Sequence, residues 1–338
     1  MQVDDQTRGI HAAIPMRDDR GRECLVCVLK YTFAVSATGE VEVVSDGRAP
    51  LLCDQHAGAD PATSSLRRHS DLVVAKPGTD VVLVGHAHPP AGAEARSVEV
   101  ALRVGPIDKA VRVSGPRLFR EAALGGVEPG PALPITAPVP LVYELAWGGL
   151  DTADPARAVG DPRNPAGLGV ARDPRDLVGR PAPRIEAARG PRDVPAGFGP
   201  IHRHWQPRAG FAGTYDAAWQ ATRMPIPPED HDPRFEVTVP HDQWAPVALR
   251  GDEPVEVRGA TPGGLWRFAL PRLAPGFASF VGGRRTDHPT HLDTWVIDAD
   301  EGRCELTFRA AVPLPRKYEL LERVKIFEKR VVGRRAAS

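Results

Sequence analysis

Cysteine is scarce in this chain, with only Cys24, Cys27, Cys53 and Cys304 among 338 residues. So few thiols in so long a chain exclude a disulfide framework. No charge of either sign is in excess, because 43 Lys and Arg residues balance 43 Asp and Glu residues. The sequence therefore has no general attraction for nucleic acid or anionic lipid.

Long hydrophobic runs are missing as well. No segment approaches the ~20 apolar residues of a membrane-spanning helix. The first ten residues, MQVDDQTRGI, are polar and acidic, unlike a signal peptide. We therefore expect a soluble, cytoplasmic protein that neither inserts into a membrane nor binds nucleic acid.

Proline and glycine, by contrast, are abundant, at 36 and 33 residues. Together they make about a fifth of the chain, well above the roughly 12% of average proteins. Both residues interrupt helices and strands. Because 42% of the residues are nevertheless hydrophobic, the composition predicts a real core built from many short strands and turns.

Residues 1–150 carry the pattern of β-strands. The stretch 24–35, CLVCVLKYTFAV, is apolar and rich in β-branched residues, as expected for a buried strand. It is predicted to form a hairpin with 41–44. Apolar residues alternate in 97–105, which indicates a strand with one buried face. Further strands are predicted at 71–75, 80–88, 109–119 and 141–147, with a Pro/Gly-rich connector at 120–140.

The rest of the chain divides into three regions. Residues 151–230 consist of turn after turn, and only 214–224 predicts a short helix, with Thr214 as a possible N-cap. Strand patterns return in 231–315, and residues 316–338 form either a docked terminal helix or a basic tail that meets a partner. Strands in the third region are predicted at 235–239, 254–259, 265–270, 277–283, 291–298 and 303–312.

These patterns together predict a mainly β fold. Many short strands at even spacing favour sandwich- or barrel-like antiparallel sheets. Residues 231–315 are expected to pack on the N-terminal β-rich region. A long irregular Gly/Pro-rich central insertion and a short C-terminal helix complete the expected fold.

The most informative segment is 195–219, PAGFGPIHRHWQPRAGFAGTYDAAW. Its glycines and prolines exclude an ordinary helix or strand, but its aromatic side chains are too apolar for a disordered linker. Ordered loops of this length are uncommon unless they bind something. The alternative is that the aromatic side chains only fix the loop to its own core. The aromatic residues are Phe198, Trp205, Phe211, Tyr215 and Trp219.

Histidine pairs raise the possibility of a metal site. His86 and His88 are two residues apart at the end of a predicted strand, so both rings could reach one ion. His202 and His204 repeat this spacing in the irregular loop. The alternative for each pair is a solvated or hydrogen-bonded histidine near a loop. The spacing of Cys24 and Cys27 places their side chains on opposite faces of a strand, which indicates buried free thiols rather than a zinc site.

Motifs of common enzymes are not found. GxSxG, a phosphate-binding loop and a dinucleotide fingerprint are missing where the context would support them. No pair of carboxylates is placed by the sequence for glycoside hydrolysis. We therefore predict no catalytic residue and no cofactor.

Several stretches together resemble one bacterial family. It is the large family of unknown-function domains whose members accompany type VI secretion spike and effector genes. Here Leu145 and Trp147 stand where that family usually has Arg and Phe, and Phe308 stands where Trp is frequent. The matching stretches are 76–81, 85–87, 143–149, 164–169, 197–201, 205–208, 213–216, Trp219, 240–243 and 292–298.

The resemblance implies an effector adaptor or chaperone without established catalytic residues. Aromatic and Arg anchors dominate protein interfaces, so the irregular loops are the expected contact surface for a secreted effector and possibly the spike protein. Two alternatives remain open: a metal-dependent enzyme on a β-sandwich that uses the two histidine pairs, and a structural component of the secretion apparatus. The residues expected to contact the partner are Asn164, Phe198, Trp205, Arg208, Phe211, Tyr215 and Trp219.

Overall fold

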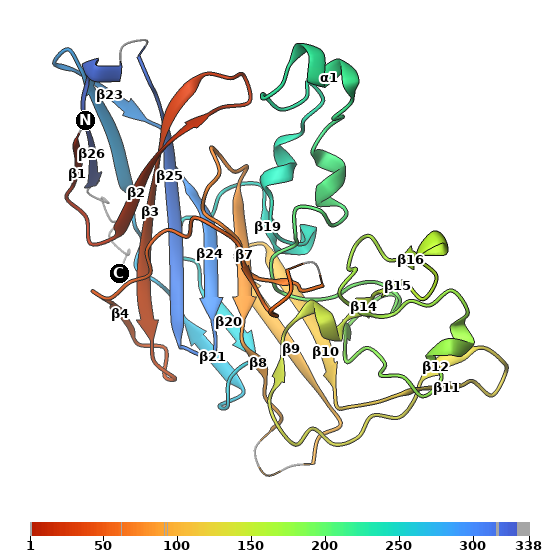
Figure 1. The fold of residues 1–338 in the computed structure, drawn as a ribbon. Coiled ribbons are helices and arrows are strands. Elements are labelled where there is room, and N and C mark those ends of the chain that lie inside the picture. Colours follow the sequence, from red (N-terminus) through yellow and green to blue (C-terminus); the bar gives the residue numbers. More distant parts are fainter. Residues whose placement is uncertain (1, 62, 91, 93, 316–317, 330–338) are drawn as a thin grey trace.

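The computed structural model describes residues 2–61, 63–90, 92, 94–315 and 318–329. As predicted, the fold is mainly β, and α1 (Ala217–Thr222) is the one α-helix in the described part of the chain. The strands form several open sheets (Figure 1). The prediction of a barrel is wrong for the described residues, because the two end strands of the largest sheet do not pair with each other.

A seven-stranded sheet lies at the centre of the molecule. Its strand order is β19-β7-β24-β25-β3-β2, with β4 paired to β3. Hairpins join β2 to β3 and β24 to β25, whereas β7 and β24 run parallel. The strands are β2 (Ile10–Arg17), β3 (Glu23–Val35), β4 (Val41–Val43), β7 (Thr79–Val84), β19 (Trp244–Ala245), β24 (Leu292–Asp298) and β25 (Arg303–Pro313).

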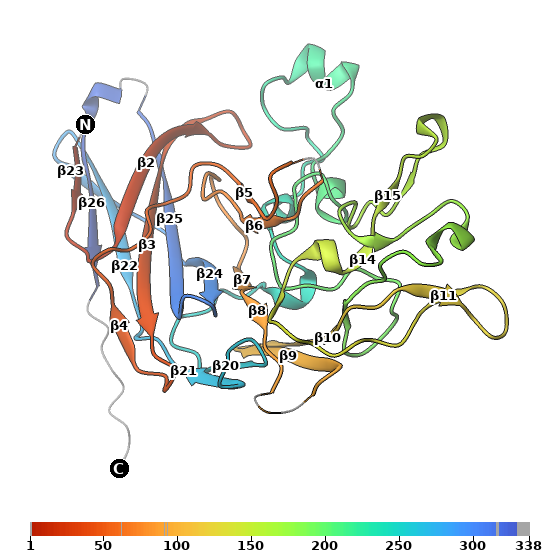
Figure 2. The same cartoon turned by 60° about the horizontal axis from the view of Figure 1, so that its bottom comes forward.

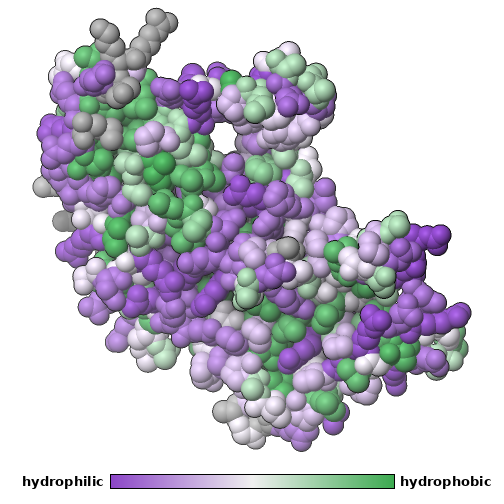
Figure 3. Space-filling view, viewed as in Figure 1, coloured by the Kyte–Doolittle hydropathy of each residue, from purple (hydrophilic) through white to green (hydrophobic). Residues whose placement is uncertain are grey.

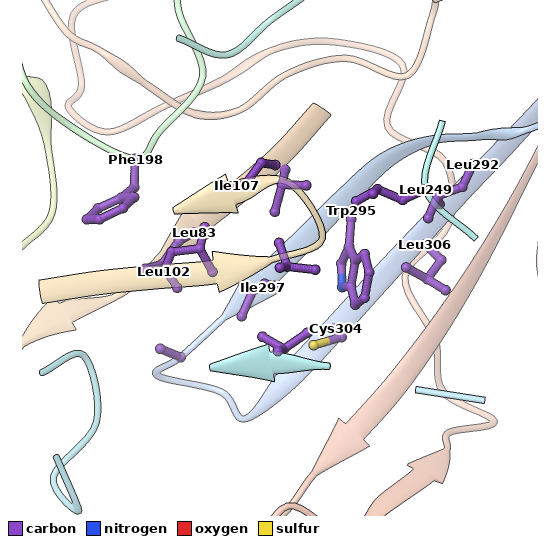
Figure 4. Packing of buried hydrophobic residues seen from close by; sticks show 14 of the residues in the cluster. Leu83, Leu102, Ile107, Phe198, Leu249, Leu292, Trp295, Ile297, Cys304 and Leu306 are labelled. Atoms are coloured by element: carbon purple, nitrogen blue, oxygen red, sulfur yellow. The ribbon is translucent and has the colours of Figure 1, made fainter. Parts of the chain in front are cut away.

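One face of this sheet is apolar and forms the main core. Side chains alternate across a strand, so Tyr31 and Phe33 of β3 share this face with Trp295 of β24 and Leu306 of β25. Figure 4 shows Trp295, Ile297, Cys304 and Leu306 packed beside Leu102 and Ile107. A second sheet, which contains Leu102 and Ile107, thus covers this side of the core.

Two further sheets contribute to the same core. The five-stranded sheet has the order β18-β10-β9-β20-β21, and the four-stranded sheet has the order β1-β26-β22-β23 (Figure 2). The five strands are β9 (Ser97–Val104), β10 (Ile107–Ser114), β18 (Ile185–Ala187), β20 (Val255–Arg258) and β21 (Leu265–Phe268). The four strands are β1 (Gln2–Asp5), β22 (Pro275–Val281), β23 (Arg284–His288) and β26 (Leu321–Glu328).

The opposite face of the central sheet carries buried charges. Lys30 Nζ lies 2.6 Å from a carboxylate oxygen of Asp71, and Lys76 Nζ lies 2.6 Å from one of Asp80. Asp293 pairs with Arg309. A buried charge is tolerated only when it is paired and hydrogen-bonded. Segments 46–76 and 198–240 supply partners for these groups, so they cover this polar face.

The remaining elements are short. Two-stranded pairings and single turns of 3₁₀-helix connect the sheets, and segment 151–230 contains no strand longer than three residues. The strands are β5 (Gln55–His56), β6 (Leu66–Arg68), β8 (His86–Ala87), β11 (Phe119–Glu121), β12 (Val127–Pro129), β13 (Val139–Pro140), β14 (Trp147–Gly148), β15 (Leu150–Asp151), β16 (Val159–Gly160) and β17 (Leu168–Gly169). The 3₁₀-helices are η1 (Tyr143–Leu145), η2 (Pro155–Arg157), η3 (Pro174–Leu177), η4 (Arg208–Phe211), η5 (Pro233–Glu236), η6 (His241–Gln243) and η7 (Tyr318–Leu320).

Three predicted strands are wrong. Residues 71–75 form none, because the carbonyls of Asp71 and Val73 accept hydrogen bonds from the Arg309 guanidinium instead of a neighbouring strand. Residues 235–239 form none either, since Asp80 binds the Thr238 amide. Segment 141–147 becomes η1 followed by the two-residue β14.

The predictions for the helices need two corrections. The C-terminal helix is wrong, because residues 321–328 form β26, which pairs parallel to β1 and antiparallel to β22. Its buried Val324 and Ile326 are two residues apart, the period of a strand. Residues 316–317 and 330–338 of the predicted tail lie outside the described residues. The helix predicted at 214–224 is present as α1, but Asp216 rather than Thr214 caps it, by accepting from the Trp219 amide.

Candidate functional site

Four of the seven residues expected to contact a partner lie in the interior. Phe198 and Asn164 are 0% exposed, Arg208 is 2% exposed and Trp205 is 6% exposed. Their contacts are with the chain itself. They are therefore anchors that hold the irregular loops in place, and in this conformation they offer no surface to a partner.

Arg208 binds together three segments of the chain. Its Nε donates to the Phe235 carbonyl at 2.6 Å, its Nη1 to the Ile201 carbonyl at 3.0 Å, and its Nη2 lies 3.0 Å from His69 Nε2. The guanidinium also stacks on the Phe235 ring. Burial lowers the pKa of Arg208 to about 10. The planar fork of donors explains why arginine occupies this position.

Asn164 fixes the Tyr-Glu-Leu-Ala-Trp-Gly-Gly stretch. Its Nδ2 donates to the Tyr143 and Trp147 carbonyls, both at 2.8 Å. Gly148 has a φ of +144°, and a Cβ there would lie 2.2 Å from the Asn164 carbonyl oxygen. The Tyr143 ring meets Trp205 edge to face at 5.9 Å. Hydrogen bonds thus hold together two of the stretches that carry the family resemblance, 143–149 and 164–169.

Other stretches of the resemblance have the same structural role. Gln243 Nε2 donates to the Val81 and Phe198 carbonyls at 2.8 and 2.9 Å, and its Oε1 accepts from Lys109. Glu144 accepts from both the amide and the hydroxyl of Ser65 at 2.7 Å. These side chains hold the irregular segments to the sheets.

The other three expected residues lie on an arm that leaves the body of the protein. Segment 211–232 carries α1 and projects outward, at the top of Figure 1. Tyr215 is 56% exposed, and its ring lies 4.6 Å from that of Trp219. Trp219 Nε1 donates to the Ile226 carbonyl, so this ring also stabilises the arm. Phe211 is half-buried under Arg234.

An apolar groove of about 1020 Å³ lies away from this arm. Leu118, Leu133 and Val178 line it and are 54%, 59% and 41% exposed. Leu145, the last residue of η1, lines it too. In Figure 3 the part of the molecule that holds β11 and β12, at the lower right, shows small apolar patches between hydrophilic residues. Exposed apolar side chains gathered in one groove are typical of interaction sites.

Arginines surround this groove. Arg117 pairs with Glu186 at 2.9 Å, and Arg120 pairs with Glu128 at 2.8 Å. Arg184 donates to the Ser114 carbonyl and has no carboxylate partner among the described residues. Burial lowers the pKa of Arg184. The groove thus combines an apolar floor with basic edges.

Sequence reasoning missed the groove, because its lining combines the end of the predicted strand 109–119, the segment 120–140 treated as a connector, and residues of segment 145–184. The available signal was the presence of large apolar residues in a stretch without strand periodicity. Leu133 stands in segment 120–140 among glycines and prolines, and Leu118 lies just before that segment, at the end of the predicted strand 109–119. Such residues are too apolar for a solvated loop, but their positions alone do not show which surface they share.

The histidines of the proposed metal site pack in separate places. His86 Nδ1 lies 2.8 Å from a carboxylate oxygen of Asp300. The His202 ring stacks near those of His204 and His56, with centroids 5.1 and 5.8 Å away. Burial lowers the pKa of His88 and of His202. Within the described ranges, no three His, Cys, Asp or Glu side chains are placed to hold a metal ion.

The cysteine prediction agrees with the packing. Cys27 lies in the main core, whereas Cys24 belongs to a small cluster with Val26 and Val28 on the other face of β3. Both thiols are buried and free. The pair therefore has no common side from which to bind zinc.

Comparison with known proteins gives a family. A family described as "uncharacterized protein conserved in bacteria (DUF2169)" matches residues 20–309. No curated protein and no solved structure matches the chain. In the described part of the chain, none of the helices has the length and apolar character needed to cross a membrane. The match covers most of the chain, so this protein belongs to the DUF2169 family of bacterial proteins.

Proposed function

We propose that this protein is a non-enzymatic cytoplasmic adaptor that binds a type VI secretion effector and helps to load it on the spike. The apolar groove carries this proposal. The resemblance of the sequence to domains that accompany spike and effector genes gives the class of partner. No cofactor is required for this role.

The groove suits an apolar segment of a protein partner. Leu118, Leu133 and Val178 are each roughly half exposed, and covering them contributes on the order of 1 kcal/mol per side chain. A partner segment that also fills the groove against Leu145 and Phe119 gains further contacts. Energy on this scale supports a specific but reversible complex, as an adaptor needs.

The edges of the groove indicate the charge of the segment. Arg184 has no carboxylate partner among the described residues, and Arg120 pairs only at the surface, where its interaction with Glu128 is weak. Glu121 is the one acidic residue that lines the groove. We therefore expect an apolar segment with acidic neighbours. The exposed Tyr215 on the arm supplies a second, smaller contact.

The test is a double variant, Leu118→Glu with Leu133→Glu. Both side chains are exposed, so the fold is expected to remain intact. Val247→Glu is the matched control, because Val247 is 83% exposed and lies outside the groove. The measurement is a tagged pull-down from the native cell, combined with the amount of effector released into the medium.

Wild type and the Val247→Glu control are expected to retain one effector, and the double variant is expected to lose both its binding and its release. An unchanged yield of effector with the double variant would overturn the assignment of the groove. Stable co-sedimentation with secretion sheaths, without an effector, would instead identify a structural component of the apparatus. The metal-enzyme alternative is supported by no observation in the described part of the structure.

A further inference from the structure

A second, unrelated cavity lies on the polar face of the central sheet. Its volume is about 260 Å³. Lys30, Val82, Thr294 and Glu305 form its floor on four adjacent strands, and residues of segment 48–71 cover it. It is separated from the apolar groove, with which it shares no lining residue.

Cations dominate the surface that faces this cavity. Two carboxylates, Asp71 and Glu305, also line it. Arg68 pairs with Asp298 and with Glu305, and Lys76 pairs with Asp80; Asp298 and Asp80 are 2% and 1% exposed and do not line the cavity. The cationic lining residues are Lys30, Arg48, Arg67, Arg68 and Lys76.

Some of these groups have unused hydrogen-bonding capacity. The buried Arg68 donates to Glu305 through Nη1 and to Asp298 through Nη2, but its Nε has no partner. Arg67 has no ion pair with any described residue, although it stands at the exposed side of the cavity. A buried donor without a partner is destabilising, so a ligand that accepts a hydrogen bond from it is favoured.

An unused acceptor lies beside this donor. Glu305 Oε2 is buried, 3.5 Å from Lys30 Nζ, and accepts no hydrogen bond. A carboxylate acceptor repels a fully deprotonated anion but binds one that still carries a proton. Inorganic phosphate keeps such a proton at neutral pH, and a phosphomonoester keeps it below its second pKa of about 6, whereas sulfate carries none.

His69 adds no charge to the cavity that it lines. Its Nδ1 lies 2.6 Å from the Ser70 carbonyl, and its Nε2 faces Arg208. Burial and the neighbouring cations Arg208 and Lys76 lower the pKa of His69 well below its ordinary value. The ring is therefore neutral at pH 7, and the arginines and lysines alone provide the attraction for an anion.

The volume limits the size of a ligand. One water occupies about 30 Å³ of liquid, so the cavity of about 260 Å³ has room for roughly eight waters. Pockets for drug-sized molecules begin near 300 Å³. A phosphate group with a small organic substituent fits this space, whereas a nucleotide exceeds it.

We propose that this cavity binds a phosphate group, either as inorganic phosphate or as a small phosphomonoester. The cationic lining attracts the group, Arg67 and Arg68 donate to its oxygens, and Glu305 Oε2 accepts a hydrogen bond from its hydroxyl where the group still carries a proton. This site is independent of the adaptor function and of the groove.

The test is calorimetric titration of the full chain with inorganic phosphate, glycerol phosphate and sulfate at constant ionic strength. Binding of one or both phosphate compounds at millimolar concentration, with sulfate at least about tenfold weaker, is the expected result. The stronger of the two phosphate compounds identifies the source of the group. Absence of binding by both, or equal binding of sulfate, overturns the proposal.

Two variants locate the binding. Arg67→Ala removes an exposed side chain and is expected to weaken phosphate binding about tenfold, because a hydrogen bond to a charged group is lost. Arg112→Ala is the matched control, since Arg112 is exposed on β10 outside the cavity. Glu305→Gln is expected to reduce the preference for phosphate over sulfate. Unchanged affinity in Arg67→Ala would place any binding elsewhere and overturn the assignment.

Discussion

Arg208 was expected to contact a partner, but its contacts indicate that it stabilises the fold. The two roles predict different results for Arg208→Ala: loss of partner binding in the first case and loss of stability in the second. In Arg208→Ala the carbonyl oxygens of Ile201 and Phe235 lose their donor. Each buried acceptor without a partner costs about 1–3 kcal/mol. Removal of a buried charge offsets part of this cost. We expect a net loss of about 3 kcal/mol in the free energy of unfolding.

The assay is urea unfolding, supported by thermal unfolding. For a chain of this size, about 3 kcal/mol corresponds to a fall in Tm of roughly 4 °C. Arg203→Ala is the control, because Arg203 lies in the same loop with a side chain that is 43% exposed and 3.8 Å from Asp54. This variant is expected to stay within about 0.5 kcal/mol of wild type.

Arg208→Lys refines the test. Lysine keeps the positive charge but lacks the planar fork that reaches three acceptors at once, so an intermediate loss of stability is expected. If Arg208→Ala unfolds at the same urea concentration as Arg203→Ala but no longer binds the effector, the structural role is refuted and Arg208 is an interface anchor.

Two other predictions concern backbone geometry and pH. Gly78→Ala is expected to destabilise the protein by about 2 kcal/mol or more, because Gly78 has a φ of +71° and the new Cβ would lie 2.2 Å from the Ala245 carbonyl oxygen. Urea unfolding measures the loss. Gly125→Ala is the control for backbone strain alone, because Gly125 has a φ of +90° but a Cβ there would meet no atom within 4 Å. Burial lowers the pKa of His69 well below that of the unfolded chain, near 6.5. Below pH 6.5 the histidine of the unfolded chain binds a proton that the folded protein does not bind. The contribution of His69 to the free energy of unfolding is therefore fully present above about pH 6.5 and falls below it, by at most about 1.4 kcal/mol per pH unit. His69→Gln is expected to reduce the change in the free energy of unfolding between pH 7.5 and 5.5. If this change is the same as in wild type, the pH dependence comes from other groups, such as His202 and His288, whose pKa values burial also lowers.

Local patterns were sufficient for much of the fold. The strands β3, β9, β24 and β25 were predicted because continuous or alternating apolar residues fix both the element and its buried face. The helix α1 was predicted from its composition, although its cap was displaced by two residues. Strands β1 and β26 were missed because each is stabilised by pairing with a segment far away in the chain.

The candidate site depended more strongly on tertiary contacts. The sequence correctly indicated that the aromatic segment is ordered, but not that Phe198 and Trp205 point into the core. Burial of an aromatic or arginine side chain depends on which segments cover it, and those segments come from distant parts of the chain. The groove at Leu118 and the cavity at Arg68 likewise arise from residues that only folding brings together.

The sequence by itself therefore determined the mainly β class, the positions of strands such as β3, β9, β24 and β25, and the family, because these depend on spacing between near neighbours. Only the tertiary structure decided which charged residues are buried. Lys30, Arg68 and Arg309 look like ordinary surface residues in the sequence, yet each is buried opposite a carboxylate from another segment. The physical reason is that a buried charge requires a partner, and the position of that partner is set by the packing of the whole chain.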